Sequence, residues 1–352
     1  MKEVILVFVE TDTGEFGVGE IWAFYGSSAS ICFLINNDFA PLVEGQDPYF
    51  TEKIRARIDG LALVGTIEGI MMNALSGVDM ALWDLKGKLL QAPLYKLLGA
   101  YSEKVYAYAS GGLYGKGKTL DSLKDEVGGY VSQGFTGVKI KIGGVSQAED
   151  LERIKAVREA VGTNVRVMVD AIHAYNVPEA LRMAEAMKPY DIYWFESPVA
   201  LDDTEGHAIL NTRGGIPVCA NESLYGVVDY NELMRRRATE FVHFDLCACG
   251  GVTTAIKIAA IAEAHGMNCT LHAANGVLLF AASVHFAASI PNLDSVEYHH
   301  VHQRMREYAP SETMELFDGP YLKPVERPGF GMDFLTPDFA DKLIAELEEQ
   351  AN

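Results

Sequence analysis

The spacing of apolar and polar positions changes along the chain, and each change predicts a different element. Two apolar runs, Val4–Val9 and Phe16–Val18, flank the turn residues 12–14, so the first twenty residues are expected to form a β-hairpin. From about Ile70 to Leu98, apolar residues recur three and four positions apart, which predicts a long helix that Pro93 must break. The N-terminal region therefore combines a hairpin with helices.

From Val105 onward the chain repeats one unit, a short β-rich run followed by a loop and an amphipathic helical stretch. Eight runs at this pitch favour a parallel barrel of the TIM type, with a doubly wound open sheet as the structural alternative. The expected strands are Val105–Ala109, Gly137–Ile142, Val165–Val169, Ile192–Phe195, Pro217–Ala220, Phe241–Phe244, Asn268–Leu271 and Ser295–Val296.

The tail from about Tyr308 is rich in proline and glycine ahead of a last helical stretch. We expect it to pack back on the N-terminal region, as part of a capping domain that is separate from the barrel. The expected division of the chain is 1–104 for the cap, 105–307 for the barrel and 308–352 for the returning segment.

Six of the expected strands end in an ionisable residue. The spacing from one to the next is 23 to 27 residues, about one strand–helix unit. In a barrel the C-terminal ends of the strands converge on one mouth, so these side chains would share a small volume, which is costly for a core and useful for a site. They are Asp170, Glu196, Glu222, Asp245, His272 and Glu297.

Three of these residues offer only carboxylate oxygens. Adjacent carboxylates repel one another, so Asp170, Glu196 and Glu222 together predict a bound cation, with Mg²⁺ first and Mn²⁺ second. Each acid taken alone is better interpreted as a solvent-facing or helix-capping residue. Their recurrence in three consecutive units favours the metal site.

Two lysines and a histidine are candidate bases. Lys139 and Lys141 are two apart on one strand, so both point to the same side, towards the acids, and a neighbouring cation would favour a neutral lysine. Asp245 lies one strand before His272 and could orient its ring and support its charged form. The structural alternatives are surface lysines and a core histidine.

Composition disfavours nucleic-acid-binding, membrane-spanning and disulfide-rich proteins. A formal net charge of −19 disfavours nucleic acid as a partner. The apolar run Val4–Val9 is too short for a signal sequence or a membrane span, so we expect a cytoplasmic enzyme with no membrane partner. The five cysteines have neither zinc-like nor disulfide-like spacing, and we expect buried, reduced thiols.

Longer motifs make the picture specific. GVKIKIGG, VMVDA, YWFESP, LHAANG, FDLCACGGVTTAIKIAAIAEAHG and the helical ALSGVDMALWDLKGKLLQAPLYKLLGA resemble the mandelate racemase branch of the enolase superfamily, and DGPYLKPVERPGFGMDF is similar to its closing hairpin. The resemblance covers nearly the whole chain. It implies a modified (β/α)7β barrel with an α+β capping domain, a small carboxylate substrate, and a homo-oligomer, either a dimer or an octamer.

The resemblance also implies residue roles. Asp170, Glu196 and Glu222 match the family's magnesium ligands. Lys141 matches the base on one face of the substrate, and Lys139 its neighbour near the substrate carboxylate. His272, with Asp245, matches the acid/base on the opposite face, and Glu297 is expected to hydrogen-bond a carboxylate oxygen.

The chain departs from the family pattern at three places. Apolar Ile172, followed by His173, stands where members carry a polar residue, and Asn221 stands where a glycine often precedes the third ligand. Residues 1–20 resemble the second and third strands of the cap, so the first strand and the substrate-selecting loop after it are expected to be absent. The remaining candidate lid is Ile21–Ser30, whose aromatic residues could equally be core or subunit contacts.

The implied chemistry is Mg²⁺-dependent removal of the α-proton of a carboxylate, through an enediolate. Dehydration of an acid sugar, an aldonate or aldarate, to a 2-keto-3-deoxy acid is the favoured reaction. Racemisation or epimerisation of a 2-hydroxy or sugar acid and sugar-lactone cycloisomerisation are the alternatives. More remote hypotheses are a Schiff-base aldolase using Lys139 or Lys141 and an inactive binding protein.

Overall fold

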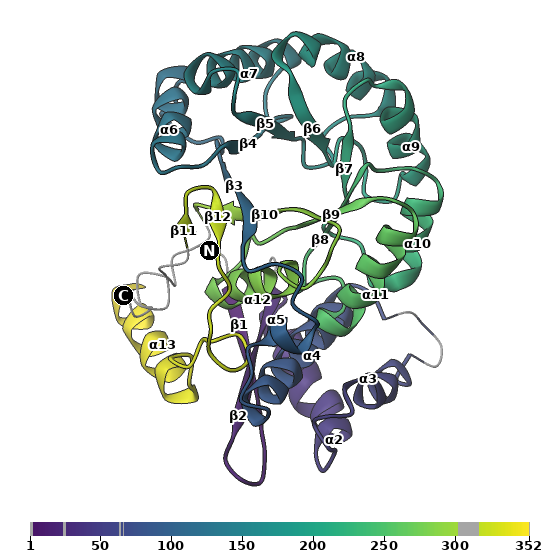
Figure 1. Cartoon of the computed structure of the whole chain (residues 1–352), viewed down its shortest axis with the longest axis vertical. Helices are drawn as coiled ribbons and strands as arrows, with labels where there is room; N and C mark the ends of the chain where they lie inside the picture. Colours follow the sequence, from purple (N-terminus) through teal and green to yellow (C-terminus); the bar gives the residue numbers. More distant parts are fainter. Residues whose placement is uncertain (1–2, 24–25, 63–64, 66, 302–316, 352) are drawn as a thin grey trace.

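The computed structural model of the chain describes residues 3–23, 26–62, 65, 67–301 and 317–351. A ring of strands wrapped by helices forms one part of the molecule, and the N-terminal hairpin with its helices packs against it (Figure 1). Within the described residues, no helix is both long and apolar enough to cross a membrane.

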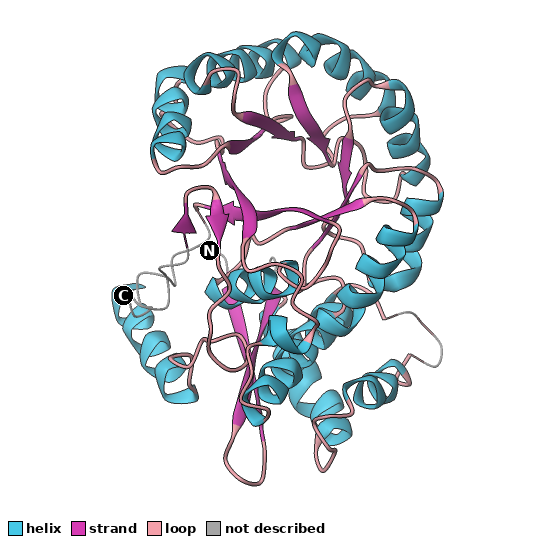
Figure 2. Ribbon diagram, viewed as in Figure 1, coloured by secondary structure: helices cyan, strands magenta, loops and turns pink. Residues whose placement is uncertain are grey.

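Eight parallel strands form a closed barrel, because the last strand pairs with the first as well as with its predecessor. This confirms the barrel and excludes the open sheet. Figure 2 shows the strands inside a ring of helices. The strands are β3 (Val105–Gly111), β4 (Gly137–Lys141), β5 (Arg166–Asp170), β6 (Ile192–Glu196), β7 (Val218–Ala220), β8 (Phe241–Phe244), β9 (Asn268–Leu271) and β10 (Leu293–His299).

Seven α-helices, one after each strand from β3 to β9, connect the barrel strands within the continuously described stretch 67–301, as a (β/α)7β barrel requires. Local sequence starts several of them: Thr119, Ser146 and Asn176 each form a capping box at a helix N-terminus. The helices are α6 (Leu120–Ser132), α7 (Gln147–Val161), α8 (Val177–Met187, extended by the 3₁₀ turn η2, Lys188–Tyr190), α9 (Thr204–Arg213), α10 (Gly226–Arg235), α11 (Gly251–Ala264) and α12 (Val277–Ala287).

The cap contains the predicted hairpin, formed by β1 (Glu3–Glu10) and β2 (Phe16–Ala23). β2 packs closely on α4 (Ile70–Leu89): a Cβ at Gly17 or Gly19 would lie 2.1 or 1.9 Å from a carbonyl oxygen of that helix. After α4, Pro93 breaks the helix as predicted. The remaining helices are α1 (Ser28–Leu34), the π-helical turn η1 (Ile35–Phe39), α2 (Ala40–Val43), α3 (Thr51–Asp59) and α5 (Leu94–Leu97).

β2 is longer than the pattern predicted, and this corrects the interpretation of Ile21–Ser30 as a lid. Its residues 21–23 continue the strand and are buried, and Ser28 already begins a helix. Pairing with β1 extends to Ala23, which the short run Phe16–Val18 did not indicate. Phe24 and Tyr25 lie outside the described residues.

Two cap carboxylates hold the cap against the barrel. Glu20, fully buried on β2, accepts the backbone N–H groups of Gly276 and Leu279 at the start of α12, the second at 3.1 Å. Asp79 on α4 accepts the N–H of Thr253 near the start of α11 at 2.9 Å. Unsatisfied N–H groups at a helix start favour an anion, so both contacts stabilise the docked cap.

The C-terminal segment contacts both parts of the molecule. Its strand β12 (Tyr321–Leu322) pairs with β11 (Phe317–Asp318) and, antiparallel, with β3. Buried Asp84 on α4 accepts the N–H of Val18 at 3.0 Å and that of Phe330 at 2.8 Å. The segment ends in α13 (Pro337–Ala351).

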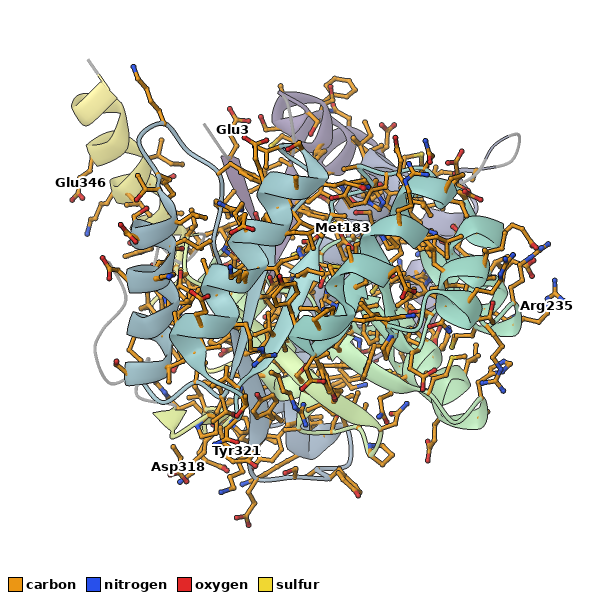
Figure 3. All side chains as sticks on the ribbon, turned by 90° about the horizontal axis from the view of Figure 1, so that it is seen from above. Glu3, Met183, Arg235, Asp318, Tyr321 and Glu346 are labelled. Carbon is orange, nitrogen blue, oxygen red and sulfur yellow. The ribbon has the colours of Figure 1, made fainter. Side chains whose placement is uncertain are left out.

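Asp84→Ala should lower the free energy of unfolding by about 3–5 kcal/mol, because it leaves the buried ammonium of Lys88, 2.8 Å from Asp84, and two N–H groups without their acceptor. Urea unfolding followed by circular dichroism measures this. Asp318→Ala is the control. Asp318 lies at the periphery beside Tyr321 (Figure 3), and its ion pairs with described residues, Lys104 and Lys323, are exposed, so its loss should cost under about 1 kcal/mol. Equal shifts in the two variants would contradict the role of Asp84.

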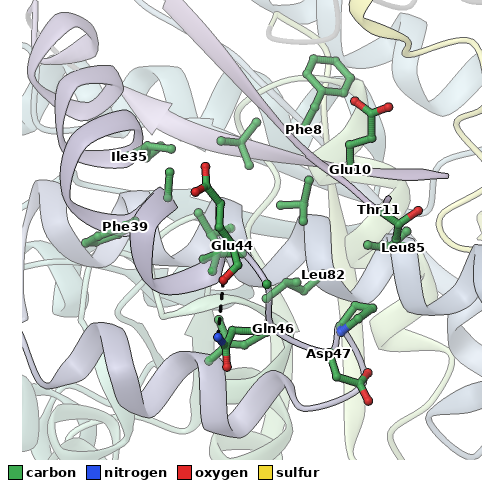
Figure 4. Close-up of a pocket in the computed structure, with 18 of the residues that line it drawn as sticks. Phe8, Glu10, Thr11, Ile35, Phe39, Glu44, Gln46, Asp47, Leu82 and Leu85 are labelled. Atoms are coloured by element: carbon green, nitrogen blue, oxygen red, sulfur yellow. Dashed lines mark hydrogen bonds between the residues drawn. The ribbon is translucent and has the colours of Figure 1, made fainter. Parts of the chain in front are cut away.

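A cavity of about 760 Å³ lies in the cap between β1, the η1–α2 segment and α4. Apolar side chains such as Phe8, Phe39 and Leu82 line it, together with Glu10 and Glu44 (Figure 4). None of the predicted catalytic or metal-binding residues lines it. The candidate chemistry is therefore at the barrel mouth, away from this cavity.

Candidate active site

The three predicted metal ligands meet at the C-terminal ends of neighbouring strands. Asp170 ends β5, Glu196 ends β6, and Glu222 follows β7 by two residues. All three are at least nine-tenths buried. Two residues before Asp170 and Glu196 on the same strands, Met168 and Trp194 belong to a separate buried apolar cluster, which therefore lies one layer below the acids.

Each acid is held by neighbouring groups. The Oδ1 atom of Asp170 accepts the N–H of Ile172 at 2.9 Å. The Oε2 atom of Glu196 accepts the indole N–H of Trp194 at 3.2 Å, and Oε2 of Glu222 accepts the hydroxyl of Ser197 at 3.0 Å. Fixed carboxylates of this kind form a preorganised oxygen site.

Both candidate lysines point into the cluster. The Nζ atom of Lys139 lies 2.6 Å from Oε1 of Glu196 and 3.0 Å from Oε1 of Glu297. Lys141 donates to Oδ2 of Asp170. Burial opposes the charged form of Lys139, but the two glutamates outweigh it and raise its pKa well above the usual range.

The sequence-based expectation of a neutral Lys141 applies to the lysine beside a cation, and the surrounding acids act on its pKa in the other direction. Burial lowers this pKa, but the Asp170 carboxylate raises it further, so the net shift is upward and favours the ammonium form. The expectation assumed that a cation neutralises the acids. Asp170, followed by Glu196 and Glu297, stabilises the charged lysine.

His272 and Asp245 form a buried pair at the ends of β9 and β8. The Nδ1 atom of His272 is 2.6 Å from Oδ2 of Asp245, and Oδ1 of Asp245 is fixed by the N–H of Cys247 at 2.7 Å. The Nε2 atom of His272 is directed to the cluster, 3.6 Å from Oε2 of Glu297. The ring of Trp22, from the cap, lies 5.5 Å from the imidazole. The cap hairpin therefore contributes to the wall around this histidine.

Glu297 on β10 lies between the two candidate bases. It is fully buried, contacts Lys139 with one oxygen and accepts the N–H of Ala273 with the other at 3.2 Å. Burial opposes its ionisation, but Lys139 and His272 outweigh burial and hold its pKa well below the usual range. It is therefore an anion that balances Lys139.

His243 is a site residue that the sequence analysis missed. It lies on β8, two residues before Asp245 and on the same side of the strand, and it is fully buried. Its Nε2 atom is 3.6 Å from Oε1 of Glu196. Burial, with Lys139 nearby, lowers the pKa of His243 to about 3. The two-residue alternation in the run FVHFD was the signal that could have identified it.

The charge of the cluster suits a divalent cation. The cluster contains five buried carboxylates and two lysine ammonium groups, so its net charge is −3 when all seven are ionised. The carboxylates are those of Asp170, Glu196, Glu222, Asp245 and Glu297, and the lysines are Lys139 and Lys141. Burial first, and then Asp170 and Glu222, raise the pKa of Glu196 well above its usual value. Oxygen atoms of Glu196 and Glu222 lie with a nitrogen of His243 within 4.8 Å of one another, a spacing that could hold an ion. The residues present therefore fit a cation.

The residues that depart from the family pattern border the site. Ile172 and His173 both have left-handed backbones, with φ of 46° and 60°, and Ile172 is 56% exposed. This turn lets the Ile172 N–H reach Asp170, although a β-branched residue is uncommon there. Asn221 is buried just before Glu222 and donates to the carbonyl of Leu201 at 3.4 Å. The apolar surface at Ile172 therefore lies within two residues of a candidate ligand.

Two parts of the chain match the domains of known protein families. Residues 1–99 match the N-terminal domain of mandelate racemase/muconate lactonizing enzyme, and residues 122–338 match the enolase C-terminal domain-like family. The cap and the barrel therefore each match a domain of the same family.

Individual relatives span three reaction classes. An arabinonate dehydratase of Saccharolobus solfataricus is 35% identical over 94% of this chain and 87% of its own length. A D-galactarolactone cycloisomerase of Agrobacterium fabrum is 34% identical over 94% and 88%. The crystal structure of a racemase from Streptomyces coelicolor A3(2) with bound magnesium superposes with a TM-score of 0.84 at 30% identity, covering 96% of this chain and 94% of that one.

Proposed function

The chain belongs to the mandelate racemase and muconate lactonizing enzyme family of the enolase superfamily, and from this premise we propose that it dehydrates an acid sugar to a 2-keto-3-deoxy acid. It is an enzyme of the lyase or isomerase class, as its relatives are. The observation that carries the proposal is the placement of two candidate acid/base groups around one carboxylate cluster, with Lys141 at the end of β4 and His272 directly after β9.

Removal of an α-proton requires a base and a place for charge. In the proposed reaction, neutral Lys141 accepts the proton at Nζ, and the electron pair of the C–H bond passes towards the substrate carboxylate. Asp170 opposes the neutral form by raising the pKa of Lys141, and engagement of Asp170 by a cation would relieve this opposition. Lys139, fixed by Glu196 and Glu297, contributes a permanent positive charge near the reacting carboxylate.

Loss of water requires an acid on the opposite face. His272 in its protonated form, oriented by Asp245, donates a proton to the β-hydroxyl, which leaves as water with the electron pair of the C–O bond. The resulting enol tautomerises to the 2-keto acid. The substrate and the products thus balance as one acid sugar against one 2-keto-3-deoxy acid and one water.

Asp170, Glu196 and Glu222 would hold the Mg²⁺ that the family implies. When bound, the cation supplies positive charge to the substrate carboxylate as a second negative charge develops on it. The buried, fixed oxygens of these residues and the net negative charge of the cluster support this assignment.

Racemisation is the second candidate, because the same two bases can exchange a proton on opposite faces of one carbon. The similarity to a racemase and to a cycloisomerase supports racemisation as an alternative to dehydration. A Schiff-base aldolase is disfavoured, because its amine chemistry needs no metal, whereas Lys139 and Lys141 lie among buried carboxylates that fit a cation.

A library of aldonic and aldaric acids, incubated with the magnesium-loaded enzyme, separates these reactions. A dehydratase accumulates 2-keto acid, which semicarbazide detects. A racemase or epimerase gives no 2-keto acid but changes optical rotation or incorporates deuterium from D₂O. Turnover of an acid sugar without any 2-keto product would contradict the dehydratase assignment.

A further inference from the structure

The proposed reaction gives no role to the buried imidazole of His243. The imidazole of His243 is fully buried, and its Nε2 atom is 3.6 Å from Oε1 of Glu196. A buried polar group in such a place is costly to desolvate unless it has a partner. The partners of its two ring nitrogens therefore indicate what this histidine could bind.

The hydrogen bonds of His243 define which nitrogen carries the proton. Its Nδ1 atom lies 3.2 Å from the carbonyl oxygen of Thr270, and a carbonyl oxygen can only accept. The hydrogen is therefore on Nδ1, and Nε2 presents a lone pair. Within the described residues, Nε2 of His243 has no hydrogen-bond partner. A metal-binding histidine is commonly arranged in this way, with its far nitrogen bound to a carbonyl.

The free nitrogen points at candidate metal ligands. Nε2 lies 3.6 Å from Oε1 of Glu196, which is too long for a hydrogen bond. Adjacent ligands about 2.1 Å from one octahedral cation are about 3.0 Å apart, so a shift of about 0.6 Å would let both atoms bind one ion. Nε2 and one oxygen each from Glu196 and Glu222 also lie within 4.8 Å of one another.

Existing contacts leave room for such a cation on the acids. Oε1 of Glu196 is engaged by Lys139 and Oε2 by Trp194, but each carboxylate oxygen has two lone pairs. Glu222 is engaged at Oε2 by the hydroxyl of Ser197.

We propose that His243 supplies an imidazole nitrogen to the divalent cation held by Glu196 and Glu222, so that the site favours Mn²⁺ over Mg²⁺. Magnesium prefers oxygen ligands, whereas first-row transition ions accept imidazole readily. The inference rests on the metal site of the proposed function and adds to it a fourth residue and a metal preference.

The test is pulsed electron paramagnetic resonance of Mn²⁺ bound to the substrate-free enzyme. Wild type should show hyperfine coupling to a directly bound ¹⁴N, which changes to ¹⁵N coupling in protein labelled at histidine. His243→Gln should bind Mn²⁺ without this coupling and at least about tenfold more weakly, while its affinity for Mg²⁺, measured by calorimetry, changes less than about threefold. His272→Gln is the matched control and should retain the nitrogen coupling.

The outcomes separate the inference from the proposed function. If wild type binds Mn²⁺ without nitrogen coupling, or if the coupling persists in His243→Gln, the inference is wrong and the carboxylate site stands. If wild type binds neither Mn²⁺ nor Mg²⁺, both are wrong. The wild-type spectrum decides the question even if His243→Gln fails to fold, which its circular dichroism and melting curve would reveal.

Discussion

Lys141→Ala should reduce kcat by about 1,000-fold or more on every substrate whose α-proton faces this lysine. The residue is nearly buried and pairs with Asp170 at the barrel mouth, so its loss removes the proposed base and leaves that carboxylate without its ammonium partner. Steady-state kinetics with magnesium-loaded enzyme measures the effect.

Lys141→Arg separates the base from the charge. Arginine keeps the positive charge beside Asp170, but its guanidinium cannot act as a base near neutral pH, so this variant should be as inactive as the alanine variant. Lys155→Ala, at an exposed position of α7, is the control and should retain wild-type kcat. Substantial activity of Lys141→Arg would show that charge, not proton transfer, is the contribution of Lys141.

Glu196→Gln should weaken Mg²⁺ binding by about 100-fold or more and reduce turnover to the background rate. The substitution keeps the shape of the side chain and removes one of the anionic charges on which the cation site depends. Isothermal titration of Mg²⁺ into EDTA-dialysed protein measures the affinity. Added Mg²⁺ should restore the activity of the EDTA-treated wild type but not that of the EDTA-treated Glu196→Gln variant.

The fold should survive Glu196→Gln, because Lys139 keeps Glu297 as a charged partner at 3.0 Å. A melting temperature close to that of the wild type would show this. Glu185→Gln, on the exposed face of α8, is the control and should change neither affinity nor turnover. Full, EDTA-sensitive activity of Glu196→Gln would remove Glu196 from the metal site.

Much of the barrel could be predicted from the sequence, because buried parallel strands are short apolar runs at a regular pitch. The expected boundaries of Phe241–Phe244 and Asn268–Leu271 agree with β8 and β9. The pattern underestimated β2 and β10. Their last residues, such as Trp22 and His299, are held by pairing with neighbouring strands, which local composition does not record.

The site was predictable where it depends on strand ends and less so elsewhere. Asp170, Glu196 and His272 all stand at such ends, so one topological rule brings them together. His243 lies one layer deeper and resembled a core residue. The upward pKa shift of Lys141 depends on its contact with Asp170, a distance that no sequence pattern encodes.

Exchange of the substrate α-proton in D₂O tests the central claim, that Lys141 and His272 act on opposite faces, most directly. With a substrate whose proton faces Lys141, His272→Asn should still exchange this proton with solvent but form no product, because the opposite-face acid is lost. Lys141→Ala should show neither exchange nor product, and the wild type should accumulate a 2-keto acid. Wild-type exchange by Lys141→Ala on every accepted substrate would contradict the account.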